Sequence, residues 1–362
     1  MRHFNNNKIS IILPSYNEVK NISKIIQEIQ LNLKNKNFEV IIIDDNSEDN
    51  TSRSILKKFS KNKNIILVQR EFNRSLIKSI KMGLQISTGE VCVVMDSDGQ
   101  HSIDDFNKML KKIKNKDIII GVRNLKEIEF LSNSRKYLST FFNWYLSRIL
   151  NFRISDPLTG FFIFKSKLLN KKFFEIESTG FKVLLDLLYS TKNKKLKIEE
   201  HTVVFKKRKF GKTKLNISVF FSFLTQILSF NLGCIFSPPF IGFLLIGLSG
   251  FFIYFFIFLN SFYNLNINYN YSYIISAIFT TFYNFNLNNL LNYFERKKFF
   301  SLNYFSSITK YYIANIPGLI IGLNIAIILK DKFFVNLILA TIAGSSIDSW
   351  FKYYVSKIWI FK

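Results

Sequence analysis

Between Leu215 and Phe294 the sequence contains no Asp, Glu, Lys or Arg. This stretch is rich in Phe and Ile, and a soluble domain cannot hide so much uncharged chain from water. We therefore expect the second half of the chain to lie in lipid. The first half is long enough to form a complete domain with its own core.

Cysteine is also scarce. The chain has 2, Cys92 inside a predicted strand and Cys234 in the uncharged region. Two isolated cysteines exclude a disulfide framework and a cysteine-based metal site, and they are typical of the reducing cytoplasmic side of a membrane. The Asn- and Lys-rich amino terminus leads directly into a predicted strand, so we expect no signal peptide.

Nucleic-acid-binding motifs are missing as well, although the chain carries a net charge of +25. There is no helix-turn-helix, no zinc finger and no basic, aromatic RNA-binding pattern, so we expect no nucleic-acid partner. Most of the net charge falls on residues 1–214. A basic soluble half favours an anionic membrane face and phosphorylated substrates.

The first half does contain a regular alternation of apolar strands and amphipathic helices. This alternation predicts an α/β fold with a parallel-rich, Rossmann-like sheet and helices on both faces. The expected strands are Lys8–Leu13, Phe38–Ile43, Ile65–Val68 and Val91–Met95.

Polar residues follow three of these strands. They are Tyr16 and Glu18, Asp44 and Asp45, and Asp96 and Asp98. The carboxyl ends of parallel strands share one edge of a sheet, where ligands bind in open α/β folds. We therefore expect the three clusters to converge on one crevice.

The last cluster has the composition of a cation site. Alternation along an extended backbone points Asp96 and Asp98 the same way. Together with the amide oxygen of Gln100 they offer hard oxygen ligands of the kind that Mg²⁺ or Mn²⁺ prefers. The alternative interpretation is an ordinary acidic turn after a strand.

Six short motifs, taken jointly, resemble a known family. They are Pro-Ser-Tyr-Asn-Glu at 14–18, Asp-Asp-Asn-Ser-Glu-Asp at 44–49, Asp-Ser-Asp-Gly-Gln-His at 96–101, Gly-Val-Arg at 121–123, Asp-Pro-Leu-Thr-Gly-Phe-Phe at 156–162, and Arg208 with Gly211, Thr213 and Lys214. Residues 8–215 thereby resemble the dolichol- or polyprenol-phosphate mannose synthases, inverting family 2 glycosyltransferases of GT-A fold. The hydrophobic half resembles the GtrA-like four-helix membrane domain fused to some of them.

The resemblance implies roles for individual residues. The implied donor-nucleotide residues are Pro14, Tyr16, Glu18, Ile43, Asp45, Asp96, Ser97, Asp98, Gln100, Arg123, Arg208 and Lys214. The implied metal ligands are Asp96, Asp98 and Gln100, and the catalytic candidates are Asp98, Arg123 and Asp156. The implied acceptor-phosphate residues are Arg123 and Arg208, because a guanidinium binds phosphate with two donors. We add Arg135 to them for its place in a Ser-Arg-Lys stretch and not for a family motif.

Some of these assignments have alternatives. Asp44 can cap the following helix, and Asp156 can position the arginines. The basic residues 206–214 can lie on anionic headgroups. We expect His101 and Glu200 to be structural, since a phosphate nucleophile needs no general base.

The chain departs from the family pattern at several positions. It has Ser75 where the family often has Gly, and Gly99 where the family has an apolar residue. Ser102 and Ile103 replace the family's two prolines after His101, and the loop after Arg123 lacks the usual pair of glycines. None of these changes removes a predicted metal or phosphate ligand, so we expect an active enzyme.

We divide the chain into a catalytic domain (1–215), an amphipathic interfacial segment (216–236) and a membrane domain (237–362). The expected spans are Phe240–Leu259, Tyr271–Leu291, Tyr311–Leu329 and Phe333–Tyr354. Basic loops at 206–214, 295–298 and 352–362 predict a cytoplasmic catalytic domain and carboxyl terminus. Asp348 and Lys352 are expected to form a salt bridge.

The leading hypothesis is mannose transfer from GDP-mannose to a polyprenyl or dolichyl monophosphate at the bilayer surface, with inversion. UDP-glucose is the rival donor, and a non-catalytic flippase or scaffold for lipid-linked sugars is the alternative from another class. The Gln-x-x-Arg-Trp motif of processive polysaccharide synthases is absent. The sequence favours no particular oligomeric state.

Overall fold

The computed structural model describes residues 5–71, 74–123, 144–152, 154–178, 180, 182–203, 217–294, 302–336, 339–340, 343 and 349–361. The chain divides into two compact units. The first contains Met1–Lys214 with Phe230–Ile235, and the second contains Leu215–Ser229 with Phe236–Lys362.

The first unit is built on a mixed sheet with the strand order β3-β2-β1-β4-β6-β5-β7. Its strands are β1 (Asn5–Ser15), β2 (Phe38–Asp44), β3 (Ile65–Gln69), β4 (Gly89–Val94), β5 (Ile118–Arg123), β6 (Phe162–Lys165) and β7 (Ile198–Val203). Its helices are α1 (Ile22–Asn32), α2 (Thr51–Phe59), α3 (Leu76–Ile86), α4 (Ile103–Lys112), α6 (Lys171–Glu175) and α7 (Val183–Ser190). The predicted α/β class and the parallel-rich sheet are confirmed.

One strand of this sheet runs against the others. β6 pairs antiparallel with both β4 and β5, whereas the pairs β1–β2, β1–β4, β2–β3 and β5–β7 are parallel. The carboxyl ends of β1, β2, β4, β5 and β7 therefore share one edge. The amino end of β6 lies at that same edge.

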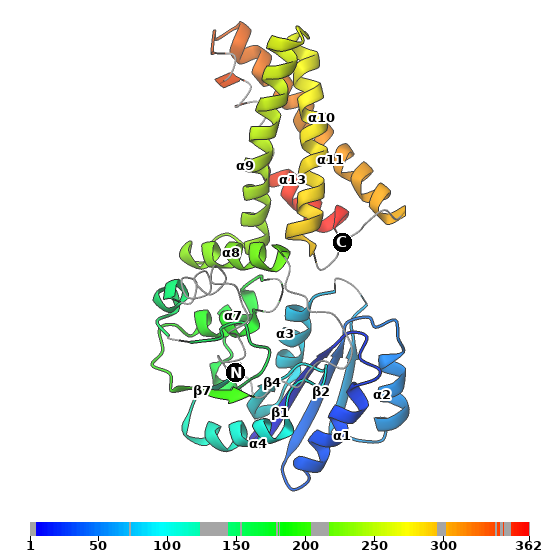
Figure 1. Cartoon of the computed structure of the whole chain (residues 1–362), viewed down its shortest axis with the longest axis vertical. Coiled ribbons are helices and arrows are strands. Elements are labelled where there is room, and N and C mark those ends of the chain that lie inside the picture. The colour runs from blue at the N-terminus through cyan, green and yellow to red at the C-terminus, as the bar shows by residue number, and fades with distance from the viewer. Residues whose placement is uncertain are drawn as a thin grey trace. The chain divides into compact units, whose positions relative to one another are not determined.

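Helices cover both faces of the sheet (Figure 1). On one face, Ile11 and Leu13 of β1 share a core cluster with Ile26 of α1 and Phe106 of α4. On the other face, Gly83 of α3 lies so close to Ile12 that a Cβ there would be 2.6 Å from Ile12 Cγ2. Successive residues of a strand point to opposite faces. Because helices cover both faces of the sheet, β1 is apolar on both sides.

The second unit is helical. Its described helices are α8 (Ile217–Asn231), α9 (Pro238–Leu259), α10 (Tyr269–Leu287), α11 (Leu302–Asp331) and α13 (Ser349–Val355). The last two residues of α8 are counted with the first unit. Figure 1 shows α9 and α10 side by side, and α10 also packs on α11. Aromatic rings fill the core, including Phe285, Tyr311 and Phe361.

Within the described residues, two helices are long and apolar enough to cross a membrane. They are Pro238–Asn264, with a mean hydropathy of 2.4, and Asn303–Asp331, with 2.0. They coincide with the first and third predicted spans. The second predicted span falls on α10, which is less apolar. Part of the fourth, together with Asp348, lies outside the described residues.

Candidate active site

The first and third polar clusters meet at the carboxyl edge of the sheet. β1 and β4 are neighbours, with Ile12 opposite Val94. Beyond the paired residues, the Ser97 hydroxyl donates to the main-chain oxygen of Pro14 over 2.7 Å. Because Ser97 is buried, this bond fixes the turn of the Asp-Ser-Asp motif against the end of β1.

Asp96 lies between a histidine and a glycine. Its Oδ2 is 3.7 Å from Nε2 of His101, whose buried ring packs on Phe161 with 4.6 Å between centroids. A Cβ on Gly160 would lie 2.5 Å from the same oxygen. Only glycine therefore fits beside this carboxylate. The Asp96 side chain is 32% exposed, so one side of it faces solvent.

The loop that brings Gly160 to Asp96 is anchored at both ends. Ser155 donates from its main-chain nitrogen and its hydroxyl to the Glu200 carboxylate of β7, over 2.5 and 2.8 Å. Thr159 donates from Oγ1 to the main-chain oxygen of Gly121 in β5, over 2.7 Å. Asp156 lies in this loop and accepts from the main-chain nitrogen of Leu158 over 3.3 Å. Glu200 therefore holds the loop.

Asp98 and Gln100 belong to the same turn. The main-chain nitrogen of Gln100 donates to Asp98 Oδ1 over 3.0 Å. Between them Gly99 has a φ of +76°, in the left-handed region that favours glycine. The departure from the family's apolar residue at Gly99 thus has a conformational reason.

This donor set fits a hard divalent cation. Asp96, Asp98 and Gln100 offer carboxylate and amide oxygens, and none of the three is fully buried. No group of three or more His, Cys, Asp or Glu side chains arranged for a metal occurs in the described part of the chain. Mg²⁺ commonly takes one or two carboxylates from the protein and its other ligands from phosphates and water. The three side chains are of the types that this mode uses.

The acidic side chains that follow β2 form hydrogen bonds with other residues of the protein. Asp45 is buried and accepts from Arg70 Nη1 over 2.6 Å and from the main-chain nitrogen of Ser75 over 2.7 Å. Burial raises the pKa of the Asp45 carboxyl, and the charge of Arg70 opposes that rise. Arg70 was not among the predicted site residues, because nothing near Asp45 in the sequence points to it.

Two neighbours of Asp45 are also engaged. Asp44 accepts from the hydroxyls of Ser47 and Ser52, which orders the turn before α2. The Ile43 side chain is fully buried, and a Cβ on Gly83 of α3 would lie 3.4 Å from it. Any contact of Ile43 with a ligand would therefore have to involve its main chain.

The cluster after β1 includes a second arginine that sequence reasoning missed. The Arg74 guanidinium lies over the Tyr16 ring, 4.2 Å from the centroid. Glu18 accepts from the Asn21 side chain over 2.9 Å. Tyr16 thus has one face against a cation, and Arg74 adds positive charge at this edge.

The predicted phosphate-binding residues are described only in part. Arg123 ends β5, where it pairs with Val203 of β7. Asp96 is two residues beyond Val94, and Arg123 is three beyond Ile120. Because Val94 and Ile120 both pair with Phe162, Asp96 and Arg123 lie at one edge, on either side of β6. Arg135, Arg208 and Lys214 lie outside the described residues.

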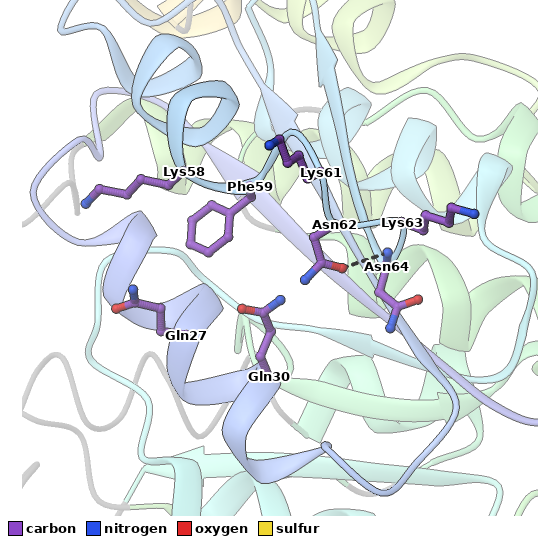
Figure 2. Close-up of a pocket in the computed structure, with 8 residues that line it drawn as sticks. All are labelled: Gln27, Gln30, Lys58, Phe59, Lys61, Asn62, Lys63 and Asn64. Carbon is purple, nitrogen blue, oxygen red and sulfur yellow. Dashed lines mark hydrogen bonds between the residues drawn. The ribbon is translucent and has the colours of Figure 1, made fainter.

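A hollow of about 550 Å³ opens elsewhere on the first unit (Figure 2). Residues of α1, of the end of α2 and of the segment entering β3 line it: Gln27, Gln30, Lys58, Phe59, Lys61, Asn62, Lys63 and Asn64. It lies at the amino ends of the strands, opposite Asp96. Its lining has no carboxylate, so it is not the predicted metal site.

Two family models match the chain. The model described as glycosyl transferase family 2 matches residues 10–176. The model described as the GtrA/DPMS transmembrane domain matches residues 242–361. The first match contains every described residue of the candidate site except Glu200. The second contains most of the helical unit and identifies a membrane protein.

Curated proteins resemble the first part of the chain. A dolichol-phosphate mannosyltransferase of Pyrococcus furiosus is 31% identical over 61% of this chain and 62% of its own length, so the chain spans less than two thirds of that relative. The enzyme of the same name from Saccharomyces cerevisiae is 27% identical over 60% and 85%. A dolichyl-phosphate beta-glucosyltransferase of Trichomonas vaginalis is 31% identical over 36% and 45%.

Among solved structures, glucosyl-3-phosphoglycerate synthase of Mycobacterium tuberculosis is similar. It shows 18% identity and a TM-score of 0.46 over 61% of this chain and 81% of its own. The two family matches and the curated relatives agree with the motifs. The chain therefore carries a family 2 glycosyltransferase domain followed by a GtrA/DPMS transmembrane domain.

Proposed function

We propose that this protein transfers mannose from GDP-mannose to a polyprenyl or dolichyl monophosphate, with inversion, and so makes a polyprenyl-phosphate β-mannose. The observation that carries the proposal is the Asp96–Asp98 turn at the carboxyl edge of the sheet, with Gly160 packed on Asp96. The relatives named dolichol-phosphate mannosyltransferase support mannose as the sugar. The relative named a glucosyltransferase makes UDP-glucose the second candidate donor.

The chemistry places few demands on a general base. The nucleophile is a phosphate oxygen that is already anionic at neutral pH, so the protein must instead offset repulsion between the acceptor phosphate and the donor diphosphate. In the proposal, Arg123, Arg135 and Arg208 bind the acceptor phosphate, and Lys214 assists on the donor side. The guanidinium groups of the three arginines suit two-point phosphate binding.

On the donor side, Asp96, Asp98 and Gln100 would hold Mg²⁺ or Mn²⁺, which neutralises charge on a departing nucleoside diphosphate. His101 and Gly160 keep the Asp96 carboxylate in place, because one packs beside it and the other leaves it room. Pro14, Tyr16, Glu18, Asp45 and the main chain of Ile43 would border the nucleotide. Asp156 would act from the loop that Glu200 anchors.

The membrane half completes the proposal. Four spans, with the catalytic domain and carboxyl terminus in the cytoplasm, would keep a polyprenyl tail in lipid while its phosphate reaches the catalytic domain. We place the catalytic domain at 1–215, the interfacial segment at 216–236 and the membrane domain at 237–362. The helix α8 coincides with most of the interfacial segment.

The donor is tested with membranes that contain the full chain and are supplied with polyprenyl phosphate. They are incubated in parallel with labelled GDP-mannose and labelled UDP-glucose, with Mg²⁺ or with a chelator. We expect a labelled, chelator-sensitive lipid from GDP-mannose. Label only from UDP-glucose would replace mannose by glucose as the sugar.

Catalysis is tested with Asp98→Asn, which we expect to lower lipid labelling at least about 100-fold. The control is Asp104→Asn, an exposed carboxylate in the first turn of α4. The control is expected to keep full activity. If Asp98→Asn labels lipid as well as the control does, the chain is a scaffold and the catalytic proposal fails.

A further inference from the structure

A cavity of about 490 Å³ lies inside the helical unit, between α9, α10 and α11. It extends along α9 from Phe243 to Tyr254, which is about 16 Å of helix and the central part of an apolar span. Its volume is within the range of small-molecule sites, roughly 300–1,000 Å³. We call it the α9–α11 cavity.

Three polar atoms in its wall lack a hydrogen bond within the described part of the chain. They are the Tyr254 hydroxyl on α9, and Thr280 Oγ1 and Asn284 Oδ1 on α10. Thr280 is 9% exposed, and Thr280 and Asn284 line the α9–α11 cavity one turn apart. A polar atom left unpaired at membrane depth is costly, because lipid offers no water to pair with it. Their position indicates a polar ligand.

Glycines on α9 make room for this arrangement. A Cβ on Gly250 would collide with Asn284 Oδ1, so glycine there lets the amide sit against the helix. Gly247 lines the cavity and has open space where a Cβ would be. In membrane helices glycine usually serves close packing of backbones. Gly247 instead leaves space in front of α9.

The rest of the wall defines the class of ligand. Leu244, Phe251 and Leu319 are apolar, whereas Asn315 and the Tyr312 ring add polar edges. Among the described lining residues, Lys352 is the one charged side chain and there is no carboxylate. These residues combine alkyl, hydroxyl and amide groups, which fits an amphiphile with a hydroxyl-rich head.

We infer that the α9–α11 cavity binds the hydroxylated head group of a glycosylated membrane lipid, with Thr280 and Asn284 as its hydrogen-bonding residues. The choice of a mannosyl head rests on the proposed function. The sugar hydroxyls donate to Asn284 Oδ1 and exchange a hydrogen bond with Thr280 Oγ1, while the first carbons of the lipid chain lie on the apolar wall.

The test uses the purified full chain in phospholipid nanodiscs and labelled dodecyl β-mannoside, which has a sugar head but neither phosphate nor nucleotide. We expect saturable binding that weakens at least tenfold in Thr280→Val/Asn284→Leu, since each substitution removes a hydrogen bond to the ligand. The same variant should melt at an equal or higher temperature, because it replaces unpaired polar atoms by apolar ones of similar size.

The matched control is Thr309→Val/Asn324→Leu. It makes the same substitutions at exposed positions of α11, where both side chains bond carbonyls of their own helix. We expect the control to bind within twofold of the unmodified protein. No saturable binding to the unmodified protein, or equal weakening in both variants, would mean that the α9–α11 cavity holds water only, and the inference would be wrong.

Two further experiments distinguish binding of a sugar head from binding of a phosphate head, and binding from catalysis. Labelled dodecyl phosphate is expected to bind the double variant and the unmodified protein alike, and a loss confined to this probe would overturn the choice of a hydroxylated head. Asp98→Asn should keep dodecyl mannoside binding. Binding without lipid glycosylation would reject the proposed function alone, and glycosylation without binding would reject the inference alone.

Discussion

The two units differ in the partners of their buried polar side chains. In the first unit, ionised groups are buried with ionised partners: Glu39 is 2.7 Å from Lys8 Nζ, and Asp186 is 2.8 Å from Lys81 Nζ. In the second unit, neutral side chains bond carbonyls of their own helix. The Ser276 hydroxyl donates to the Ser272 oxygen over 2.7 Å. Lipid cannot solvate a charge, and a helix already supplies acceptors one turn back.

The largest effect should come from breaking a buried ion pair. Glu39→Leu leaves Lys8 without its carboxylate at a position where the lysine side chain is 18% exposed. We expect the free energy of unfolding to fall by about 3 kcal/mol. The measurement is the urea midpoint of unfolding of the full chain in detergent, determined by pulse proteolysis.

The exposed pair Lys24–Glu28 on α1 is the control for this experiment. Glu28→Leu should change the free energy of unfolding by no more than about 0.5 kcal/mol, because exposed pairs are weak. Equal losses in the two variants would show that burial of the Glu39 pair does not matter.

The next largest effect is expected on lipid labelling, when one methyl group is added to a glycine in each unit. Gly160→Ala pushes its Cβ into the Asp96 carboxylate, so we expect lipid labelling to fall about 100-fold, or about 2.7 kcal/mol in the barrier. Gly247→Ala meets open space in a helix and should leave labelling unchanged while raising the melting temperature slightly. A larger loss of labelling in Gly247→Ala would reverse the comparison.

A smaller effect is expected for a polar bond in the membrane unit. Asn292 is buried and donates from Nδ2 to the main-chain oxygen of Pro239 over 2.9 Å. Asn292→Leu should cost about 1 kcal/mol, since such bonds are modest in membrane proteins. The readout is the thermal midpoint in nanodiscs, with exposed Asn324→Leu as the control. A cost as large as that of Glu39→Leu would remove the contrast between the units.

The smallest expected effect is the pH dependence of the stability that Glu39 contributes. Burial alone would raise the pKa of Glu39, but hydrogen bonds from Lys8, Ser10 and Thr88 outweigh it, and the pKa is lowered from the usual 4.5. A lowered carboxyl pKa gives stability that is present above the unfolded pKa and lost as pH falls through the folded one. The stability difference between the unmodified protein and Glu39→Gln should be constant from neutral pH to about pH 5 and shrink below that. A difference that grows on acidification would contradict the assigned shift.

Much of the first unit follows from its sequence. The four apolar runs were located to within three residues at each end, because buried parallel strands are continuous hydrophobic stretches. The strands β5, β6 and β7 were not predicted, and a run of four residues such as β6 carries no sign of its antiparallel direction. In the second unit, the first and third expected spans fall on apolar helices, and α10 is a helix despite its Asn and Tyr content.

The candidate site was predictable in part. The turn at Asp96 could be found because carboxylates that interrupt a buried strand are conspicuous. Arg70 and Arg74 could not be found, since their partners Asp45 and Tyr16 are distant in sequence and only the fold brings them together. Asp45, which was predicted to bind the donor nucleotide, accepts a hydrogen bond from Arg70. The roles of these residues toward a donor stay predictions.

The reversed direction of β6 has a consequence for how Gly160 is held beside Asp96. Each parallel strand enters the sheet at the amino edge and leaves it at the carboxyl edge, so only the segment after such a strand lies at the carboxyl edge. β6 enters the sheet at that edge, and the segment just before it, from Ser155 to Phe161, is delivered directly beside Asp96. Ser155 is held by Glu200 and Thr159 by Gly121, so the position of Gly160 is fixed by contacts on both sides of it and does not depend on the length of the chain before Ser155.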